Sequence, residues 1–186
     1  MRIILLGAPG SGKGTQGTAL AEHFGVRHVA SGELLRAHIA QDTEVGREAQ
    51  RYVERGELVP DDLVLQMVGG AVVDAVQHGG YVLDGFPRTI EQAERAYELA
   101  PADATADAAV FLDVPDDVVR VRLLGRREGR VDDADPEIVD RRMRVFHEQT
   151  EPLLDFYRDR GILLVVDAAQ SPADVTESML AALGRR

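Results

Sequence analysis

The 186-residue chain is long enough for one domain with an ordinary hydrophobic core and too short for a second core of similar size. Hydrophobic residues make up 45% and charged residues 28%, which is typical of a folded soluble protein and argues against a disordered chain. The formal net charge of −11 disfavours general binding to nucleic acids or to anionic membranes.

The residue content excludes several further classes of site. There is no cysteine, which excludes disulfides and thiolate metal sites, and the five histidines follow no metal-binding spacing. The first apolar run, residues 3–6, is too short for a signal peptide, and no stretch approaches the roughly 18 apolar residues of a membrane span. We therefore expect a cytoplasmic protein.

Apolar segments of strand length alternate with segments of helical period along the chain. The expected strands are residues 2–6, 27–30, 81–84, 109–112 and 162–166. The expected helices are residues 15–24, 31–39 with Ser31 as N-cap, 43–55, 61–77, 89–99, 116–124, a long helix that follows residue 135 and ends near 160, and 172–183.

Strands that are apolar throughout and separated by helices indicate a parallel sheet covered on both faces, which is a three-layer α/β sandwich. Residues 31–59 and 126–135 are expected as insertions over the carboxyl edge of that sheet. Ligands bind at this edge in such folds.

A glycine-rich loop follows the first strand and opens a helix. Its pattern is Gly7-x-x-x-x-Gly12-Lys13, and in this context it predicts a loop whose backbone N–H groups hold phosphates. All 21 basic residues except Lys13 are Arg, and the compact ammonium of Lys fits between phosphate oxygens. Gly14 stands where a Ser or Thr is usual, with the hydroxyl at Thr15, which argues against direct coordination of Mg²⁺ by a hydroxyl. We predict that the loop binds a nucleoside triphosphate.

Further segments, spread over almost the whole chain, carry a resemblance to a known family. In chain order they are residues 7–16 (GAPGSGKGTQ), 31–36 (SGELLR), 56–60 (GELVP), 84–89 (DGFPRT), Gln92, 125–127 (GRR), 129–133 (GRVDD) and 150–153 (TEPL). Together they resemble the nucleoside monophosphate kinases, and adenylate kinases in particular. The resemblance implies a P-loop NTPase fold with a five-stranded parallel sheet in the order 2-3-1-4-5. It also implies a single kinase domain over residues 1–186, with an NMP-binding insertion at about 30–59 and a short lid at about 126–136.

The same resemblance implies a site with two halves. ATP is expected to contact Gly10, Ser11, Gly12, Lys13, Gly14, Thr15, Arg126 and Gln170. AMP is expected to contact Ser31, Arg36, Glu57, Leu58, Val59, Gly85, Phe86, Pro87, Arg88, Gln92, Arg130 and Arg142. The Gln92 amide can both donate to and accept from the Watson–Crick edge of adenine. The related UMP/CMP kinases carry Asn at that position, which favours AMP as the acceptor.

Several cations are needed to hold two polyanions in line, and residues 120–144 contain eight Arg in 25 residues. The resemblance implies catalytic roles for Lys13, Arg88, Arg126, Arg130 and Arg142, whereas Arg120 and Arg144 are expected to balance neighbouring acids. Counting back from Thr150 favours Arg142 as the phosphate-binding Arg of its helix, with Arg141 as the alternative.

The expected reaction is MgATP + AMP ⇌ 2 ADP, by direct in-line transfer with lid closure and without a general base. Asp84, at a strand end, is expected to hold Mg²⁺ through water, and the absence of cysteine excludes a zinc-bound lid. The alternatives are a UMP/CMP kinase and a non-catalytic P-loop nucleotide-binding protein. The second should carry a motif such as Asn-Lys-x-Asp, which this chain lacks. We expect a monomer whose partners are ATP, AMP and ADP, with neither nucleic acid nor membrane.

Overall fold

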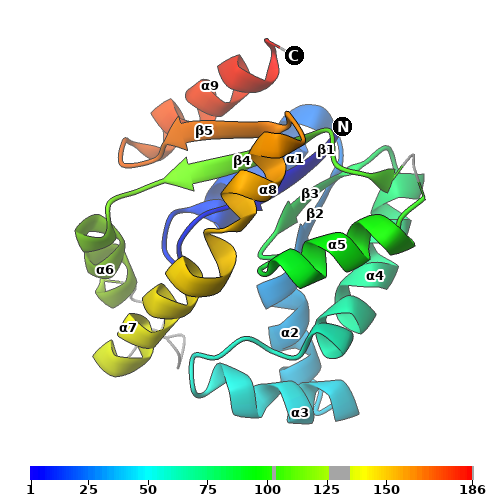
Figure 1. Ribbon diagram of the computed structural model, residues 1–186, viewed down its shortest axis with the longest axis vertical. Helices are drawn as coiled ribbons and strands as arrows, with labels where there is room; N and C mark the ends of the chain where they lie inside the picture. The colour runs from blue at the N-terminus through cyan, green and yellow to red at the C-terminus, as the bar shows by residue number, and fades with distance from the viewer. Residues whose placement is uncertain (102–103, 126–134, 186) are drawn as a thin grey trace.

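The computed structural model describes residues 1–101, 104–125 and 135–185. Within them, five parallel strands form one sheet in the order β2-β3-β1-β4-β5, which confirms the expected order (Figure 1). The strands are β1 (Arg2–Leu6), β2 (Arg27–Ala30), β3 (Tyr81–Asp84), β4 (Ala108–Asp113) and β5 (Leu163–Asp167).

Helical segments follow each strand. They are α1 (Lys13–Phe24), α2 (Ser31–Ala40), α3 (Glu44–Val53), α4 (Asp61–Gln77), α5 (Ile90–Leu99), α6 (Asp116–Leu124), α7 (Pro136–Val145), the π-helical turn η3 (Phe146–Thr150), α8 (Leu153–Asp159) and α9 (Pro172–Leu183). None of these described helices is long and apolar enough to cross a bilayer.

The core lies in two layers, one on each face of the sheet. Alternate residues of β1 point to opposite faces: Ile3 and Leu5 join one buried cluster, while Ile4 and Leu6 join the other. The first cluster is covered by side chains of α1, α6, α7 and α9, and the second by side chains of α4, α5 and α8. The expected three-layer sandwich is therefore confirmed.

The carboxyl ends of the three strands at one side of the sheet lie next to one another. Leu5 of β1 pairs with Asp84 of β3, which in turn pairs with Ala30 of β2. The segments that leave these ends are the glycine loop, α2 and residues 85–89, and they meet at this edge because the strands are parallel.

Two local expectations were wrong. Ser31 is the first residue of α2 rather than its N-cap, because its hydroxyl donates to the carbonyl of Gly85, 2.8 Å away, and does not cap the helix. The long helix expected after residue 135 is interrupted by the turn η3, where the Glu151 N–H bonds to the Phe146 carbonyl. Pro152 follows immediately, and its lack of an N–H removes a bond that a regular helix needs there.

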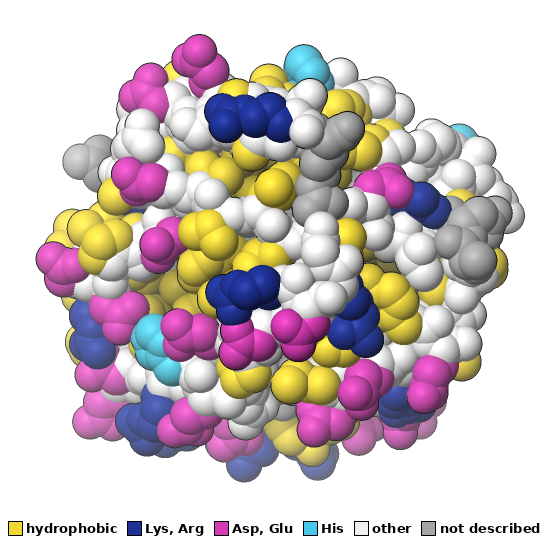
Figure 2. All heavy atoms as spheres, turned by 45° about the horizontal axis from the view of Figure 1, so that its top comes forward, with side chains coloured by type: hydrophobic (Ala, Val, Ile, Leu, Met, Phe, Trp, Pro, Cys, Tyr) yellow, Lys and Arg dark blue, Asp and Glu magenta, His cyan; other side chains and the backbone are white. Residues whose placement is uncertain are grey.

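On the face seen in Figure 2, acidic and basic side chains both lie on the surface, and some of the basic ones have acidic neighbours. The chain as a whole carries a net charge of −11.

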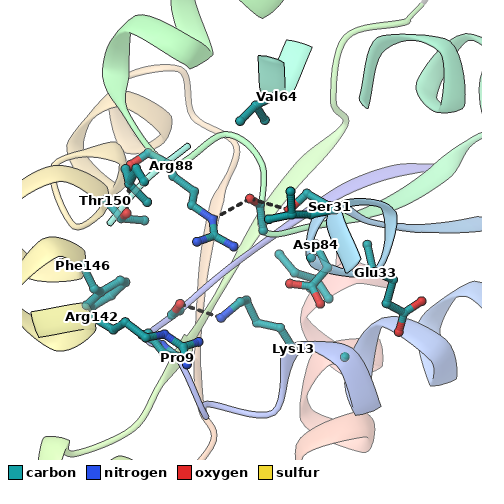
Figure 3. A pocket seen from close by; sticks show the side chains of 18 of the residues that line it. Pro9, Lys13, Ser31, Glu33, Val64, Asp84, Arg88, Arg142, Phe146 and Thr150 are labelled. Atoms are coloured by element: carbon teal, nitrogen blue, oxygen red, sulfur yellow. Dashed lines mark hydrogen bonds between the residues drawn. The ribbon is translucent and has the colours of Figure 1, made fainter. Parts of the chain in front are cut away.

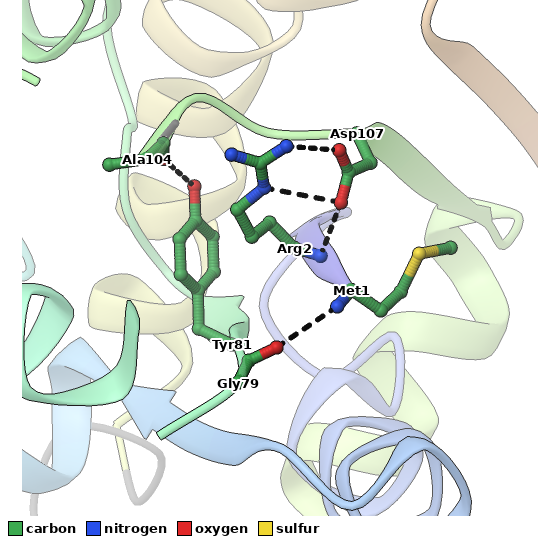
Figure 4. A network of polar contacts seen from close by, with 6 residues as sticks. All are labelled: Met1, Arg2, Gly79, Tyr81, Ala104 and Asp107. Atoms are coloured by element: carbon green, nitrogen blue, oxygen red, sulfur yellow. Dashed lines mark hydrogen bonds and ion pairs between the residues drawn. The ribbon is translucent and has the colours of Figure 1, made fainter. Parts of the chain in front are cut away.

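A polar network joins the amino-terminal ends of β1, β3 and β4, at the opposite edge of the sheet from the glycine loop (Figure 4). The carboxylate of Asp107 accepts from the Arg2 backbone N–H at 2.8 Å and from its guanidinium at 2.5 and 3.2 Å. These hydrogen bonds lower the pKa of Asp107. Nearby, the Tyr81 hydroxyl donates to the Ala104 carbonyl at 2.9 Å, and burial raises the pKa of Tyr81 to about 12.

We predict that Asp107→Asn lowers the free energy of unfolding at pH 7 by about 1 kcal/mol, a value that allows for the partial exposure of the pair. Because the pKa of Asp107 is lower in the folded chain, its contribution is present above the unfolded pKa and is lost as the pH falls through the folded pKa. The difference between wild type and variant in urea unfolding should therefore shrink below about pH 4. Exposed Asp159 supplies the control, Asp159→Asn, and equal losses for both variants would contradict the prediction.

Candidate nucleotide-binding site

A cavity of about 760 Å³ opens at the carboxyl edge of the sheet, between the glycine loop, α2, α4 and α7. Such a volume is typical of a small-molecule site. Figure 3 shows Lys13, Arg88 and Arg142 converging on this cavity from three different elements. Arg36 also lines it, so that cations gather here in a chain of strongly negative net charge.

The loop between β1 and α1 wraps tightly at one wall of the cavity. Gly7, Gly10 and Gly12 have φ of 150°, 85° and 101°, a range that favours glycine. A Cβ on Gly7 would lie 2.6 Å from Ser11 Oγ, and one on Gly10 would lie 2.9 Å from Leu123 Cγ. The loop therefore needs glycine here, and it delivers the N-terminus of α1, with its partial positive charge, to the cavity.

The side chains of this loop are positioned for an anion. Lys13 Nζ donates to the carbonyls of Gly7 and Ala8 at 2.8 and 2.9 Å, which keeps the ammonium over the loop. Ser11 Oγ is buried and has no hydrogen-bond partner among the described residues. Gly12 and Gly14 line the cavity as well, and α1 begins at Lys13.

The segment after β3 forms the opposite wall. Gly85 has a φ of 78°, the peptide between Phe86 and Pro87 is cis, and the Gly85 carbonyl accepts from both Ser31 Oγ and Arg88 Nε at 2.8 Å (Figure 3). A Cβ on Gly85 would lie 2.6 Å from Ser31 Oγ, so glycine is needed for this close approach. The Arg88 guanidinium is held facing the glycine loop.

The insertion between β2 and β3 completes this wall. Glu57, Leu58 and Val59, for which the sequence predicts contacts with AMP, all line the cavity. Arg36 also lines it, and no described residue forms an ion pair or hydrogen bond with its guanidinium.

Apolar residues that sequence reasoning missed also line this region. Val64 and Met67, three residues apart on α4, contribute to the cavity together with Phe146. Their helical spacing was a usable signal, but the same spacing is equally typical of a helix that packs on the core.

Gln92 lies in the first turn of α5, with only 1% of its surface exposed, and lines the cavity. Its Oε1 accepts from the Arg88 backbone N–H at 2.8 Å, and its Nε2 donates to Asp61 Oδ1 at 2.7 Å. Thr89 caps α5 by accepting from the Gln92 N–H. The amide is thus held in place by its neighbours.

The two neighbouring arginines of α7 point to different places. Arg142 lines the cavity, whereas the Arg141 guanidinium donates to the Arg55 carbonyl at 3.1 Å and lies 3.9 Å from the Glu57 carboxylate. Gly56 packs on the same helix, where a Cβ would lie 3.2 Å from Arg142 Cγ. The insertion therefore rests against α7 beside the cavity.

A second cavity of about 260 Å³ adjoins the first at the glycine loop, and Gly10, Gly12 and Thr15 line both. Gln170 lines it, as does Arg122 of α6, which sequence reasoning did not select. Arg122 donates to the carbonyls of Ala168 and Ala169 at 3.1 and 3.4 Å. Only the fold brings α6 beside the segment after β5, so no local pattern marks this Arg.

The remaining predicted residues are Phe86, Pro87, Arg126 and Arg130. Phe86 is 4% exposed and belongs to the core cluster under α4, α5 and α8, so its side chain supports the wall from behind. Pro87 lines the cavity. Arg126 and Arg130 lie outside the described residues.

The donor atoms near the loop suit Mg²⁺. Asp84 lines the main cavity, and a Cβ on Gly14 would lie 3.9 Å from its Oδ2, so the carboxylate faces the start of α1. No group of three or more metal-ligating side chains occurs among the described residues. Mg²⁺ is commonly bound by one or two carboxylates, with the remaining oxygens from substrate phosphates and water. The residues present fit that mode.

Comparison with known proteins agrees with this geometry. Residues 5–162 match the family model described as adenylate kinase. The chain is 45% identical to an adenylate kinase of Nocardia farcinica, with each chain covered completely, and 44% identical to adenylate kinase 1 of a Nostoc species, with 98% of each chain covered. It is 38% identical to an adenylate kinase of Lachnospira eligens, over 99% of this chain and all of the relative. From the glycine loop, the wall after β3 and these full-length similarities, we conclude that the chain belongs to the adenylate kinase family.

Proposed function

We propose that this protein catalyses the reversible transfer of a phosphoryl group from MgATP to AMP, which yields two ADP. The observation that carries the proposal is the main cavity, into which Lys13 and Arg88 point from different elements and which Arg36 also lines. A site for a single nucleotide would not need cations on both walls. Two phosphate chains that meet end to end would.

The donor half is the glycine loop with the second cavity beside it. Backbone N–H groups of residues 10–15, the Lys13 ammonium and the N-terminus of α1 would hold the triphosphate of ATP. The adenosine would extend into the second cavity, between Arg122 and Gln170. Thr15 lines both cavities, at the point where the triphosphate would pass from one to the other.

The acceptor half is the opposite wall. Arg36 and Arg88 would pair with the phosphate of AMP, because guanidinium groups bind phosphate oxygens through two parallel hydrogen bonds. The base would lie against Val59, Val64 and Met67, with Gln92 at its Watson–Crick edge.

Catalysis would come from position and charge, because the acceptor phosphate is itself the nucleophile and no covalent enzyme intermediate is needed. Lys13, Arg88 and Arg142 would offset the charge that spreads over the migrating phosphoryl group, and Arg126 and Arg130 are expected to add to it from the lid. Asp84 would orient the water around Mg²⁺, and the ion itself supplies charge neutralisation between the phosphates when bound. The protein is expected to work as a cytoplasmic monomer.

The acceptor preference gives the direct test of this function. With ATP as donor, the purified protein should form ADP from AMP at a higher kcat/KM than from CMP, UMP or GMP, because Gln92 offers both a donor and an acceptor to adenine. Product nucleotides are measured by chromatography. Activity with none of the four acceptors would refute the kinase assignment, and a preference for CMP would transfer it to the UMP/CMP kinases.

The role of Lys13 is tested by Lys13→Ala. We expect kcat/KM to fall about a thousandfold, or about 4 kcal/mol of transition-state stabilisation, with the thermal unfolding midpoint little changed. Arg88→Ala should give a loss of similar size. Near-normal turnover by either variant would contradict the role assigned to that residue.

The adjacent arginines of α7 offer a matched pair. Arg142→Ala should reduce kcat at least about a hundredfold, because it removes a cation from the reacting phosphates. Arg141→Ala should keep kcat within about threefold of wild type, because the Arg141 side chain contacts the Arg55 carbonyl, lies 3.9 Å from Glu57 and does not line the cavity. The reverse order of the two losses would show that Arg141 is the phosphate ligand.

A further inference from the structure

The hydrogen-bond partners of the Gln92 side chain fix which way its amide oxygen and nitrogen point in the cavity. Among the described residues, its Oε1 accepts from the Arg88 backbone N–H at 2.8 Å, and its Nε2 donates to Asp61 Oδ1 at 2.7 Å. An amide oxygen can accept two hydrogen bonds and an amide nitrogen can donate two. One acceptor position and one N–H therefore remain for a ligand in the cavity.

Neither partner can exchange its role. A backbone N–H only donates, and the Asp61 carboxylate only accepts. If the amide turned over, its oxygen would face the carboxylate and its NH₂ would face the Arg88 N–H, which leaves two repulsive contacts for a side chain that is 1% exposed. The orientation of the amide thus follows from the chemistry of its partners, independently of how its oxygen and nitrogen are assigned.

Asp61 acts from behind the cavity wall. It is the first residue of α4 and does not line the cavity. A negative side chain is favoured in the first turn of a helix. The next residue, Asp62, forms an ion pair with Arg95 of α5 at 2.8 Å, so the start of α4 is also joined to α5 beside Gln92. Asp61 is therefore linked to a ligand in the cavity through its hydrogen bond to the Gln92 amide.

We propose that Asp61 is a positioning residue that selects a 6-aminopurine over a 6-oxopurine at the acceptor site. The inference rests on the proposed function and adds a specificity-determining residue to it. With the amide held in one orientation, its oxygen can pair only with a hydrogen-bond donor of the base, and its N–H can pair only with an acceptor. Adenine offers that pair at its 6-amino group and N1, whereas hypoxanthine offers the opposite pair, a 6-oxo group and an N1–H.

Inosine monophosphate is the probe that isolates this effect, because it differs from AMP only at those two positions of the base. For wild type and each variant, kcat and KM are measured with ATP as donor and with either AMP or inosine monophosphate as acceptor. The quantity of interest is the ratio of the two kcat/KM values. A general loss of folded protein or of catalytic geometry lowers both values together and leaves their ratio unchanged.

Asp61→Ala removes the acceptor for Nε2, which allows the amide to turn over. We expect the ratio to fall about tenfold, through a higher KM for AMP, while the KM for ATP stays the same. Asp61→Asn keeps an acceptor oxygen without the charge, and its own amide can also donate, so a fall of about threefold is expected. Asp62→Ala is the matched control, because it removes an aspartate one residue away whose side chain is 85% exposed, and it should leave the ratio unchanged.

The outcomes separate this inference from the function on which it rests. Wild type that does not use AMP overturns both. Wild type that prefers AMP, together with an unchanged ratio in a folded Asp61→Ala, overturns the role of Asp61 alone, as does an equal fall in Asp62→Ala. If Asp61→Ala shows no cooperative unfolding transition, the test rests on Asp61→Asn. A ratio of the two kcat/KM values in Asp61→Asn equal to that of wild type then overturns the proposal. A selectivity for AMP over inosine monophosphate that decreases from wild type through Asp61→Asn to Asp61→Ala supports the proposal.

Discussion

The parallel pairing of β1 with β3 is the interaction on which the site depends. Leu5 lies opposite Asp84, so the glycine loop that leaves β1 and the segment that leaves β3 start side by side. Neither segment can stand alone, because each needs the buried sheet to hold its turn conformation. The apolar residues of β1 alternate between the two core clusters, and their burial on both faces holds this edge in place.

Electrostatics explains why the cations of the site are anchored by main-chain carbonyls. Lys13 donates to Gly7 and Ala8, and Arg88 donates to Gly85. Such contacts fix the positions of the like charges around one cavity, and a carbonyl contributes a dipole and no full charge to them. Four basic and three acidic side chains of the described residues line the cavity, in a chain whose net charge is −11, so the cavity favours an anionic ligand more than the rest of the surface does.

Arg88 connects several parts of the cavity wall. Its guanidinium lines the cavity, while its backbone N–H donates to Gln92 and its carbonyl accepts from Thr150 Oγ1 at 2.8 Å. One residue thus joins the segment after β3 to α5 and to η3. Gly85 in the same segment has a φ of 78°, and a Cβ there would lie 2.6 Å from Ser31 Oγ, so a side chain is disfavoured at this position.

The sequence by itself determined the sheet, most helices and the two walls of the cavity, because these depend on local patterns. Short stretches of sequence are enough to mark the apolar strands, the glycine positions and the Asp-Gly-Phe-Pro-Arg segment. Helix α4, for example, begins and ends at the predicted residues. The tertiary structure alone decided that Phe86 packs in the core and that Arg122 lines a cavity with Gln170, and it placed Arg142, which the sequence favoured over Arg141, at the main cavity. It also brought Asp61 to Gln92, 31 residues away. These outcomes depend on how separate helices pack together, and the direction of a side chain across such a contact is set by partners that are distant in the chain.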